Sequence, residues 1–262
     1  MSSPLPHKVI LLTGASAGIG RATAVALAQS GANVVLVARR QERLAALVAE
    51  LAVYPGQRLA IAGDVGEEAF AATAVSQTIT TFGRLDVLIN NAGLGHRSHL
   101  ADMPTADMHR LWDTNVMGMM YFTQAAIPHM KQQGGGHIIN ISSIISQRPL
   151  PNMGLYCASK TAMNFISRTF RMELRPYHIH VSTVYPGRTV TEFGDALLGQ
   201  PGANPSRVAR VSAERVAQAI VKAINTGKTE VYITWTDWLF AHLNRLFPRA
   251  TDWLVERIAR SK

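Results

Sequence analysis

The chain contains little cysteine, which limits how its fold can be stabilised. Cys157 is the only cysteine among 262 residues, so an internal disulfide is impossible. This usage fits a reducing compartment, and we therefore expect a cytoplasmic location. Cys157 lies next to Tyr156, but a small apolar side chain of this kind is most simply a buried packing residue.

Long apolar segments are also absent. No run of 18 apolar residues occurs, which argues against a membrane-spanning helix. Residues 1–8 lead into an apolar stretch without the basic segment and apolar core of a secretory signal. The content of 47% apolar and 16% charged residues is typical of a well-packed globular domain.

Clusters of basic residues are missing, although the formal net charge is +9. Lysine and arginine are spread along the chain, and no signature of a nucleic-acid-binding module is present. We therefore expect no nucleic-acid partner; an anionic cofactor, an anionic lipid surface or solubility explains the charge equally well. His96, His99 and His137 do not form a ligand cluster, so no metal site is predicted.

Short apolar runs alternate with helical segments along residues 1–234. Strands are expected at residues 9–12, 34–37, 59–62, 87–89, 137–141, 179–184 and 230–234. Helices are expected at 20–29, 43–51, 68–80, 108–130 (with a break near Pro128), 153–174 and 213–224, and a loop with a short helix at 186–205. This alternation predicts one α/β domain: a doubly wound Rossmann-type open parallel sheet of about seven strands with helices on both faces.

The remaining segment, residues 235–262, has an amphipathic helical pattern. One helical face carries the apolar residues Leu239, Phe240, Leu243, Leu246 and Phe247, and a second stripe after Pro248 carries Trp253, Leu254 and Ile258. Such a stripe predicts packing on the parent domain or on a second subunit. A helix lying on a membrane surface is the alternative, because basic residues with Trp and Phe suit that location, but it is not favoured.

Three glycines lie between the first strand and the first helix. Gly14, Gly18 and Gly20 place backbone N–H groups and a helix N-terminus where a phosphate could bind. Their spacing, G-x-x-x-G-x-G, differs from the G-x-G-x-x-G fingerprint of dinucleotide-binding sites. Because an ordinary turn would need only one glycine, the three glycines after Thr13 favour a nucleotide cofactor.

The end of the second strand indicates which cofactor is bound. A carboxylate at this place usually holds the ribose 2′-hydroxyl, whereas an arginine suits a 2′-phosphate. The chain has Arg39 and Arg40 here, and no acidic residue before Glu42. NADP(H) is therefore predicted, with Arg39 as the first candidate and Arg40 as a residue that could face solvent.

Tyr156 and Lys160 lie four residues apart in Y-C-A-S-K, on one face of a predicted helix. The pKa of a free tyrosine is about 10, too high for proton exchange at neutral pH. A neighbouring ammonium stabilises the phenolate and lowers that pKa. A pair of this kind also occurs by chance, so its meaning depends on the accompanying motifs.

Those motifs together resemble the short-chain dehydrogenase/reductase family over about residues 8–227. They are T-G-x-x-x-G-I-G after the first strand, N-N-A-G at 90–93, Asn115 in D-T-N-V-M-G, I-I-N-I-S-S ending at Ser143, Y-C-A-S-K at 156–160 and P-G at 186–187. The resemblance implies a nicotinamide cofactor at the C-terminal ends of the strands and a homodimer or homotetramer formed through the helices near 108–130 and 153–174.

The resemblance also assigns roles to four catalytic residues. Tyr156 would give its proton to the substrate carbonyl, and Lys160 would lower the pKa of Tyr156 and bind the nicotinamide ribose. Ser143 would orient the substrate oxygen, and Asn115 would hold a water connecting Lys160 to solvent. A buried residue at a helix kink is the alternative for Asn115.

Two further sets of residues follow from the motifs and the resemblance. The candidate cofactor-binding residues are Gly14, Ser16, Gly18, Ile19, Gly20, Arg39, Arg40, Asp64, Val65, Asn91, Ala92, Gly93, Tyr156, Lys160, Pro186, Gly187, Thr189 and Thr191. The candidate substrate-pocket residues are Leu94, Ser143, Ile145, Met153, Tyr156 and Phe193. Asp64 could instead cap the following helix, and Asn91 could belong to an ordinary turn.

The expected function is NADPH-dependent reduction of an uncharged, apolar ketone or aldehyde to an alcohol. The mostly apolar segments predicted to line the pocket support this substrate class, with Arg148 and Arg188 as possible exceptions. A membrane-surface-associated steroid or lipid dehydrogenase is one alternative. A non-catalytic NADP(H)-binding regulator is another, disfavoured because Asn115, Ser143, Tyr156 and Lys160 are all present.

Overall fold

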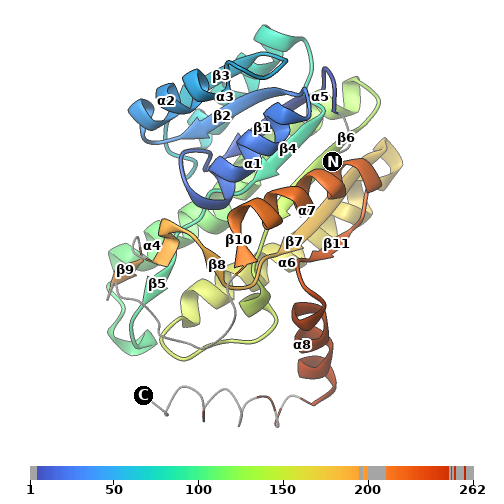
Figure 1. The fold of residues 1–262 in the computed structure, drawn as a ribbon. Coiled ribbons are helices and arrows are strands. Elements are labelled where there is room, and N and C mark those ends of the chain that lie inside the picture. The colour runs from blue at the N-terminus through green and yellow to red at the C-terminus, as the bar shows by residue number, and fades with distance from the viewer. Residues whose placement is uncertain are drawn as a thin grey trace.

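A seven-stranded parallel sheet forms the centre of a computed structural model that describes residues 5–194, 197–199, 211–247, 249, 251 and 257 (Figure 1). The strands are β1 (Val9–Thr13), β2 (Asn33–Ala38), β3 (Arg58–Ala62), β4 (Val87–Asn90), β6 (Gly136–Ile141), β7 (Ile179–Tyr185) and β11 (Glu230–Tyr232). They lie in the order β3-β2-β1-β4-β6-β7-β11, and each neighbouring pair is parallel. The predicted doubly wound sheet in a single domain is confirmed, and the strand order reverses between β1 and β4, where such sheets bind ligands.

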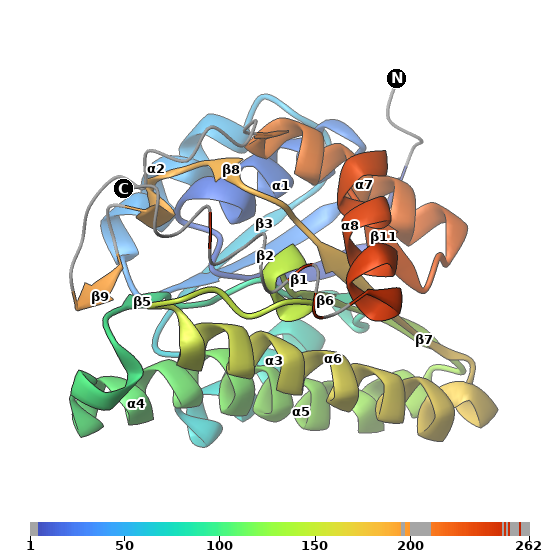
Figure 2. The same ribbon diagram turned by 90° about the horizontal axis from the view of Figure 1, so that it is seen from below.

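Helices cover both faces of the sheet. They are α1 (Gly18–Gln29), α2 (Gln41–Leu51), α3 (Glu68–Phe82), α4 (Thr105–Trp112), α5 (Gly118–Gln132), α6 (Gly154–Leu174) and α7 (Ala213–Thr226). Figure 2 shows α1, α2 and α7 on one side and α3, α5 and α6 on the other. Ile10 and Leu12 of β1 enter the core on the first side, and Leu11 enters the core on the second. Strands buried on both faces read as continuous apolar runs, which is why the sequence predicts them well.

The predicted break near Pro128 is wrong. Helix α5 continues through Pro128 to Gln132, although proline has no N–H to donate to the preceding turn. Phe122, Ala126 and Met130 of α5 are fully buried against the sheet. Their packing keeps the helix continuous despite the missing hydrogen bond.

The predicted helix 108–130 also differs at its start and in its interior. The helical segment begins three residues earlier, at Thr105, and a π-helical turn at Asp113–Met117 joins α4 to α5. Four two-residue strands were not predicted either: β5 (His96–Arg97) pairs with β9 (Leu198–Gly199), and β8 (Thr189–Val190) pairs with β10 (Val211–Ser212). Runs this short carry no periodicity from which a strand can be recognised.

The C-terminal helix α8 (Trp235–Leu246) projects from the body of the domain below β11 (Figure 1). It begins with a capping box, in which Thr234 accepts from the Asp237 backbone and Asp237 accepts from the Thr234 backbone. Ala241 is buried, but Leu246 and Phe247 are 69% and 60% exposed. The parent domain therefore does not cover the whole predicted apolar stripe.

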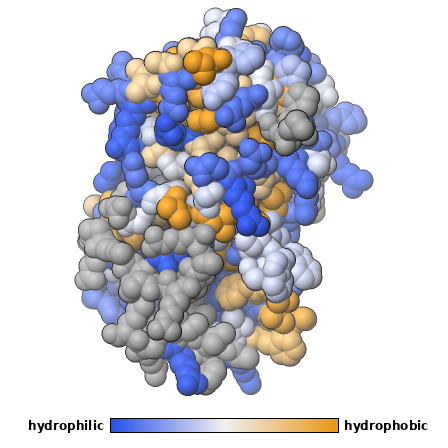
Figure 3. All heavy atoms as spheres, in the orientation of Figure 1, coloured by the Kyte–Doolittle hydropathy of each residue, from blue (hydrophilic) through white to orange (hydrophobic). Residues whose placement is uncertain are grey.

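An apolar patch over α8 is visible at the lower right of Figure 3. Its most exposed side chains are Trp235, Trp238, Leu243, Leu246 and Phe247. The second predicted stripe, with Pro248, Trp253, Leu254 and Ile258, lies outside the described residues. Among the residues that are described, no helix is long and apolar enough to cross a bilayer.

Candidate functional site

The glycine turn between β1 and α1 packs against the turn that follows β4. Gly14 and Gly18 have φ angles of +67° and +52°, which favour glycine. A Cβ on Gly14 would lie 2.8 Å from the Ala92 Cα, and one on Gly20 would lie 2.0 Å from the Gly14 carbonyl oxygen. Only glycine fits at both places, so the backbone and the N-terminus of α1 remain open to an anionic ligand.

Thr13 and Asn91 hold these two turns together. The Thr13 hydroxyl accepts hydrogen bonds from the backbone N–H groups of Asn91 (3.0 Å) and Ala92 (3.1 Å). The Asn91 amide donates to the carbonyls of Thr13 and Gly14. The Asn91 side chain, a candidate for cofactor contact, therefore shapes the phosphate cradle. The contribution of Thr13 was missed, because a threonine ending a strand carries no distinctive signal.

The two arginines after β2 contact different neighbours, Asp64 and Ser16. Arg39 Nη1 lies 3.9 Å from Asp64 Oδ2, next to the end of β3. Arg40 Nη2 donates to the Ser16 hydroxyl at 3.2 Å, so it reaches the glycine turn instead of pointing away from it. Asp64 also accepts from the Gly66 N–H at 3.0 Å. The predicted alternative, that Asp64 caps the following helix, is wrong, because the N-cap of α3 is Glu67. The two guanidinium groups therefore lie beside the end of β2, where sheets of this kind bind the 2′ position of the cofactor ribose.

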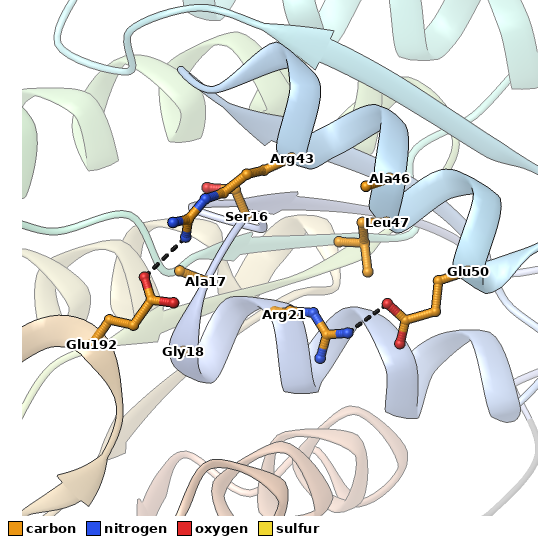
Figure 4. A pocket seen from close by; sticks show the side chains of 9 residues that line it. All are labelled: Ser16, Ala17, Gly18, Arg21, Arg43, Ala46, Leu47, Glu50 and Glu192. Atoms are coloured by element: carbon orange, nitrogen blue, oxygen red, sulfur yellow. Dashed lines mark hydrogen bonds and ion pairs between the residues drawn. The ribbon is translucent and has the colours of Figure 1, made fainter.

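A segment after β7 crosses the outer side of the glycine turn. Glu192 accepts a hydrogen bond of 2.9 Å from Arg43 of α2, which holds the pKa of the Glu192 carboxyl below its usual value. Thr191 lies against Gly18, where a Cβ would come within 3.2 Å of its methyl group. Figure 4 shows the Arg43–Glu192 pair and a second pair, Arg21–Glu50, around the pocket at this place. The pocket is lined by Ser16, Ala17, Gly18, Arg21, Arg43, Ala46, Leu47, Glu50 and Glu192.

Helix α6 places Tyr156 and Lys160 on one buried face. Their exposed fractions are 7% and 4%. Lys160 Nζ donates to the Ile141 carbonyl at 2.9 Å and lies 6.0 Å from the centroid of the Tyr156 ring. The ammonium is therefore tied to the end of β6, beside the phenol ring.

Burial dominates the proton affinities of this pair. It raises the pKa of Tyr156 above its ordinary value, with a smaller contribution from Cys157, while the hydrogen bond with Ser143 lowers it. Burial also lowers the pKa of Lys160 to about 8. The predicted lowering of the Tyr156 pKa by Lys160 is therefore wrong for the protein alone: burial raises this pKa, and the phenol is protonated at neutral pH.

Ser143 lies two residues after the end of β6 and is the N-cap of a one-turn 3₁₀ helix, Ile144–Ser146. Its hydroxyl accepts from the Ile145 N–H and donates to the Pro186 carbonyl at 3.4 Å. These long contacts leave the hydroxyl free to pair with Tyr156 as well. Ser142, by contrast, is buried and donates to the Asn164 side-chain oxygen at 2.6 Å.

Asn115 is fully buried in the π-helical turn and joins three parts of the site. Its amide nitrogen donates to the Leu94 carbonyl (2.9 Å) and to the Ser159 hydroxyl (3.0 Å), and its oxygen accepts from the Leu94 N–H at 2.7 Å. A Cβ on Gly93 would lie 3.4 Å from Lys160 Nζ. Protein atoms thus satisfy the Asn115 side chain, which favours the predicted alternative of a buried helix-kink residue. Ser159 was missed.

The candidate pocket residues come from three segments near Tyr156. Ile145 and Met153 share an apolar cluster with Tyr156. The Phe193 ring centroid lies 5.6 Å from that of the Tyr156 ring, and the Leu94 N–H donates to Asn115.

Other cofactor candidates lie elsewhere around the site. Thr189 donates to the Gly187 carbonyl, beside Pro186. The remaining candidates are Ile19, half-buried on α1, and Val65, buried after β3. In the described part of the chain, no group of three or more His, Cys, Asp or Glu could hold a metal ion.

Comparisons with known proteins agree with this geometry. The sequence model of the short chain dehydrogenase family matches residues 8–200. An uncharacterised oxidoreductase of Bacillus subtilis, YxnA, is 35% identical over 259 residues, which cover 97% of this chain and 73% of that protein.

Two solved structures are similar as well. A short chain dehydrogenase/reductase from Burkholderia phymatum in complex with NAD is 25% identical, with a TM-score of 0.85 over 94% of this chain and 95% of that one. An alcohol dehydrogenase from Thermococcus sibiricus complexed with 5-hydroxy-NADP is 28% identical, with a TM-score of 0.77 over 86% of this chain and 94% of that one. The chain therefore belongs to the short-chain dehydrogenase/reductase family and is an NAD(P)-dependent oxidoreductase acting on alcohol or carbonyl groups.

Proposed function

We propose that the protein uses NADP(H) to reduce an uncharged, apolar ketone or aldehyde to an alcohol. The observation that carries the proposal is that the Ser143 hydroxyl lies close enough to Tyr156 to lower the Tyr156 pKa, with the buried Lys160 ammonium 6.0 Å from the centroid of the Tyr156 ring. This group lies at the C-terminal edge of the sheet, on the same side as the glycine turn.

Each side chain has a distinct part in the reaction. When bound, NADPH would supply a hydride for the carbonyl carbon. Tyr156, which is protonated at neutral pH and whose pKa burial raises further, donates its proton to the carbonyl oxygen. Ser143 donates a hydrogen bond to the same oxygen and orients it. Lys160, charged below its pKa of about 8, stabilises the phenolate that remains. In the reverse direction, that phenolate accepts the alcohol proton.

The cofactor would be held by residues that follow three strands, β1, β2 and β4. The glycine turn and the N-terminus of α1 suit the pyrophosphate, and the small Gly93 leaves room beside Lys160. Arg39 and Arg40 suit a 2′-phosphate because arginine binds phosphate through two parallel donors. This pair supports NADP(H) over NAD(H).

A substrate screen tests the proposal. Wild-type protein is assayed with aliphatic, aromatic and steroid ketones and aldehydes, each with NADPH and NADH in parallel. We expect turnover of apolar carbonyls, faster with NADPH. A preference for steroids alone would favour the alternative lipid dehydrogenase. Cofactor binding without turnover of any compound would favour the non-catalytic regulator and contradict the proposal.

Replacing Arg39 by aspartate tests the cofactor preference. The change removes a charged donor and adds a like charge near the phosphate, so we expect the Kd of NADPH to rise about tenfold or more. The Kd of NADH should not rise, because NADH has no 2′-phosphate and a carboxylate at this place suits its ribose 2′-hydroxyl. Titration of both cofactors by fluorescence measures this. Arg110→Asp, an exposed substitution on α4, is the matched control. Equal weakening of both cofactors would contradict the assignment.

We also propose that α5 and α6 mediate a homodimer or homotetramer. Phe165 and Met172, seven residues apart on α6, are 66% and 70% exposed, and exposed apolar patches mark interfaces. Replacing both by glutamate should lower the mass measured by analytical ultracentrifugation to that of a smaller assembly. Val53→Glu, at a residue 79% exposed outside these helices, is the control. An unchanged mass would exclude this surface as the subunit interface.

A further inference from the structure

Helix α8 contacts the segment that follows Ser143. Asn244 of α8 accepts a hydrogen bond from Arg148 at 3.0 Å through its side-chain oxygen. The amide nitrogen of Asn244 donates to the Gln147 carbonyl. Arg148 is only 7% exposed. One amide side chain, nearly 100 residues away in sequence, thus holds two neighbouring residues through both of its polar atoms.

The segment held by Asn244 is short and directly coupled to Ser143. Gln147 and Ser146 donate their backbone N–H groups to the carbonyls of Ile144 and Ser143. The Ser146 hydroxyl also donates to the Ser143 carbonyl. A displacement of Gln147 is therefore passed to Ser143 through a single turn of backbone.

The same helix contacts a second segment that adjoins Ser143. The Asp237 carboxylate lies against Gly187, where a Cβ would come within 2.8 Å of Asp237 Oδ1. The carbonyl oxygen of Pro186, next to Gly187, accepts the hydrogen bond from the Ser143 hydroxyl. Asp237 is fixed by the capping box with Thr234. Helix α8 thus touches both segments between which the Ser143 hydroxyl is held.

We propose that Asn244 is a positioning residue, which keeps the turn after Ser143 in the conformation that presents its hydroxyl to the substrate oxygen. The proposal rests on the proposed function of Ser143. Under this proposal, α8 forms one side of the substrate site, although the opposite face of the helix is exposed to solvent. The effect is local to the carbonyl end of the site, because the contacts of Asn244 do not extend to the glycine turn or to the arginines after β2.

Two measurements test this role in Asn244→Ala. Hydrogen–deuterium exchange of residues 143–150 requires no substrate and reports the amides of the turn. Steady-state kinetics with the best compound of the substrate screen reports the site. Loss of two hydrogen bonds to partly buried groups should speed exchange about tenfold and lower kcat/KM about tenfold. The Kd of NADPH should remain within about twofold, since none of these contacts reaches the cradle.

Two further variants separate positioning from general stability. Asn244→Asp keeps the acceptor for Arg148 but removes the donor to Gln147, so we expect an intermediate effect. Asn225→Ala removes an asparagine whose amide donates to the Val221 carbonyl within α7, and it should change neither measurement. Unchanged exchange in Asn244→Ala, or faster exchange with unchanged kinetics, would overturn the positioning role. Absence of turnover by the wild-type protein would instead overturn the proposed function.

Discussion

Replacing Tyr156 by phenylalanine is expected to lower kcat by about 10²–10⁴-fold, the usual contribution of a positioned general acid. The substitution removes one hydroxyl from a residue that is 7% exposed and keeps the ring that packs against Phe193. The glycine turn and the arginines after β2 do not contact this hydroxyl. Binding of NADPH, measured by fluorescence titration, should therefore stay close to that of the wild-type protein.

The control for this prediction is a tyrosine on a neighbouring helix. Tyr121 of α5 packs at the edge of the core around α3 and α5, and Tyr121→Phe should leave kcat unchanged. Single-turnover reduction at saturating NADPH separates the proton-transfer step from product release. A Tyr156→Phe protein that retains most of its activity would mean that another group donates the proton.

The sequence predicts the site best where one helix or one strand end carries several groups. Tyr156 and Lys160 lie on one face of α6 because residues four apart on a helix always do. Arg39 and Arg40 follow β2 directly, so their location at the edge of the sheet depends only on the strand being found. Strands β1, β2 and β4 are buried along almost their whole length and read as apolar runs, which makes them recognisable without any tertiary information.

Contacts between distant segments were not predictable. The sequence does not show that Arg40 reaches Ser16, since this depends on the angle between β2 and the glycine turn. The π-helical turn that places Asn115 between Leu94 and Ser159 has no pattern of its own. The packing of α8 was predicted from its apolar stripe, but the contacts that attach it to the site are made by two polar residues, Asn244 and Asp237.

Replacing Lys160 by methionine is expected to stabilise the cofactor-free protein at neutral pH while greatly reducing turnover. Burial lowers the pKa of Lys160 from 10.5 to about 8 in the folded protein. The folded state therefore resists holding the charged amine, and a shift of about 2.5 pKa units corresponds to about 3 kcal/mol of lost stability at pH 7. Loss of the hydrogen bond to the Ile141 carbonyl offsets about 1 kcal/mol of the gain.

The pH dependence distinguishes this explanation from a simple packing effect. Between pH 8 and 10.5 the unfolded chain keeps the Lys160 proton and the folded protein has lost it, so wild-type stability rises with pH across that interval. Below pH 8 both states are protonated and the full penalty remains. The advantage of Lys160→Met, measured by urea unfolding, should thus be largest at pH 7 and disappear towards pH 10.5.

An exposed lysine provides the comparison for this measurement. Lys222→Met on α7 should change the free energy of unfolding by about 0.5 kcal/mol or less at every pH. A Lys160→Met protein less stable than the wild type at pH 7 would show that burial of the ammonium does not destabilise the folded state. A stabilised but inactive variant would show that Lys160 is retained for proton transfer at the expense of stability, as functional sites often require. The Lys160 ammonium, whose burial destabilises the folded protein, is thus the group that stabilises the Tyr156 phenolate after proton transfer.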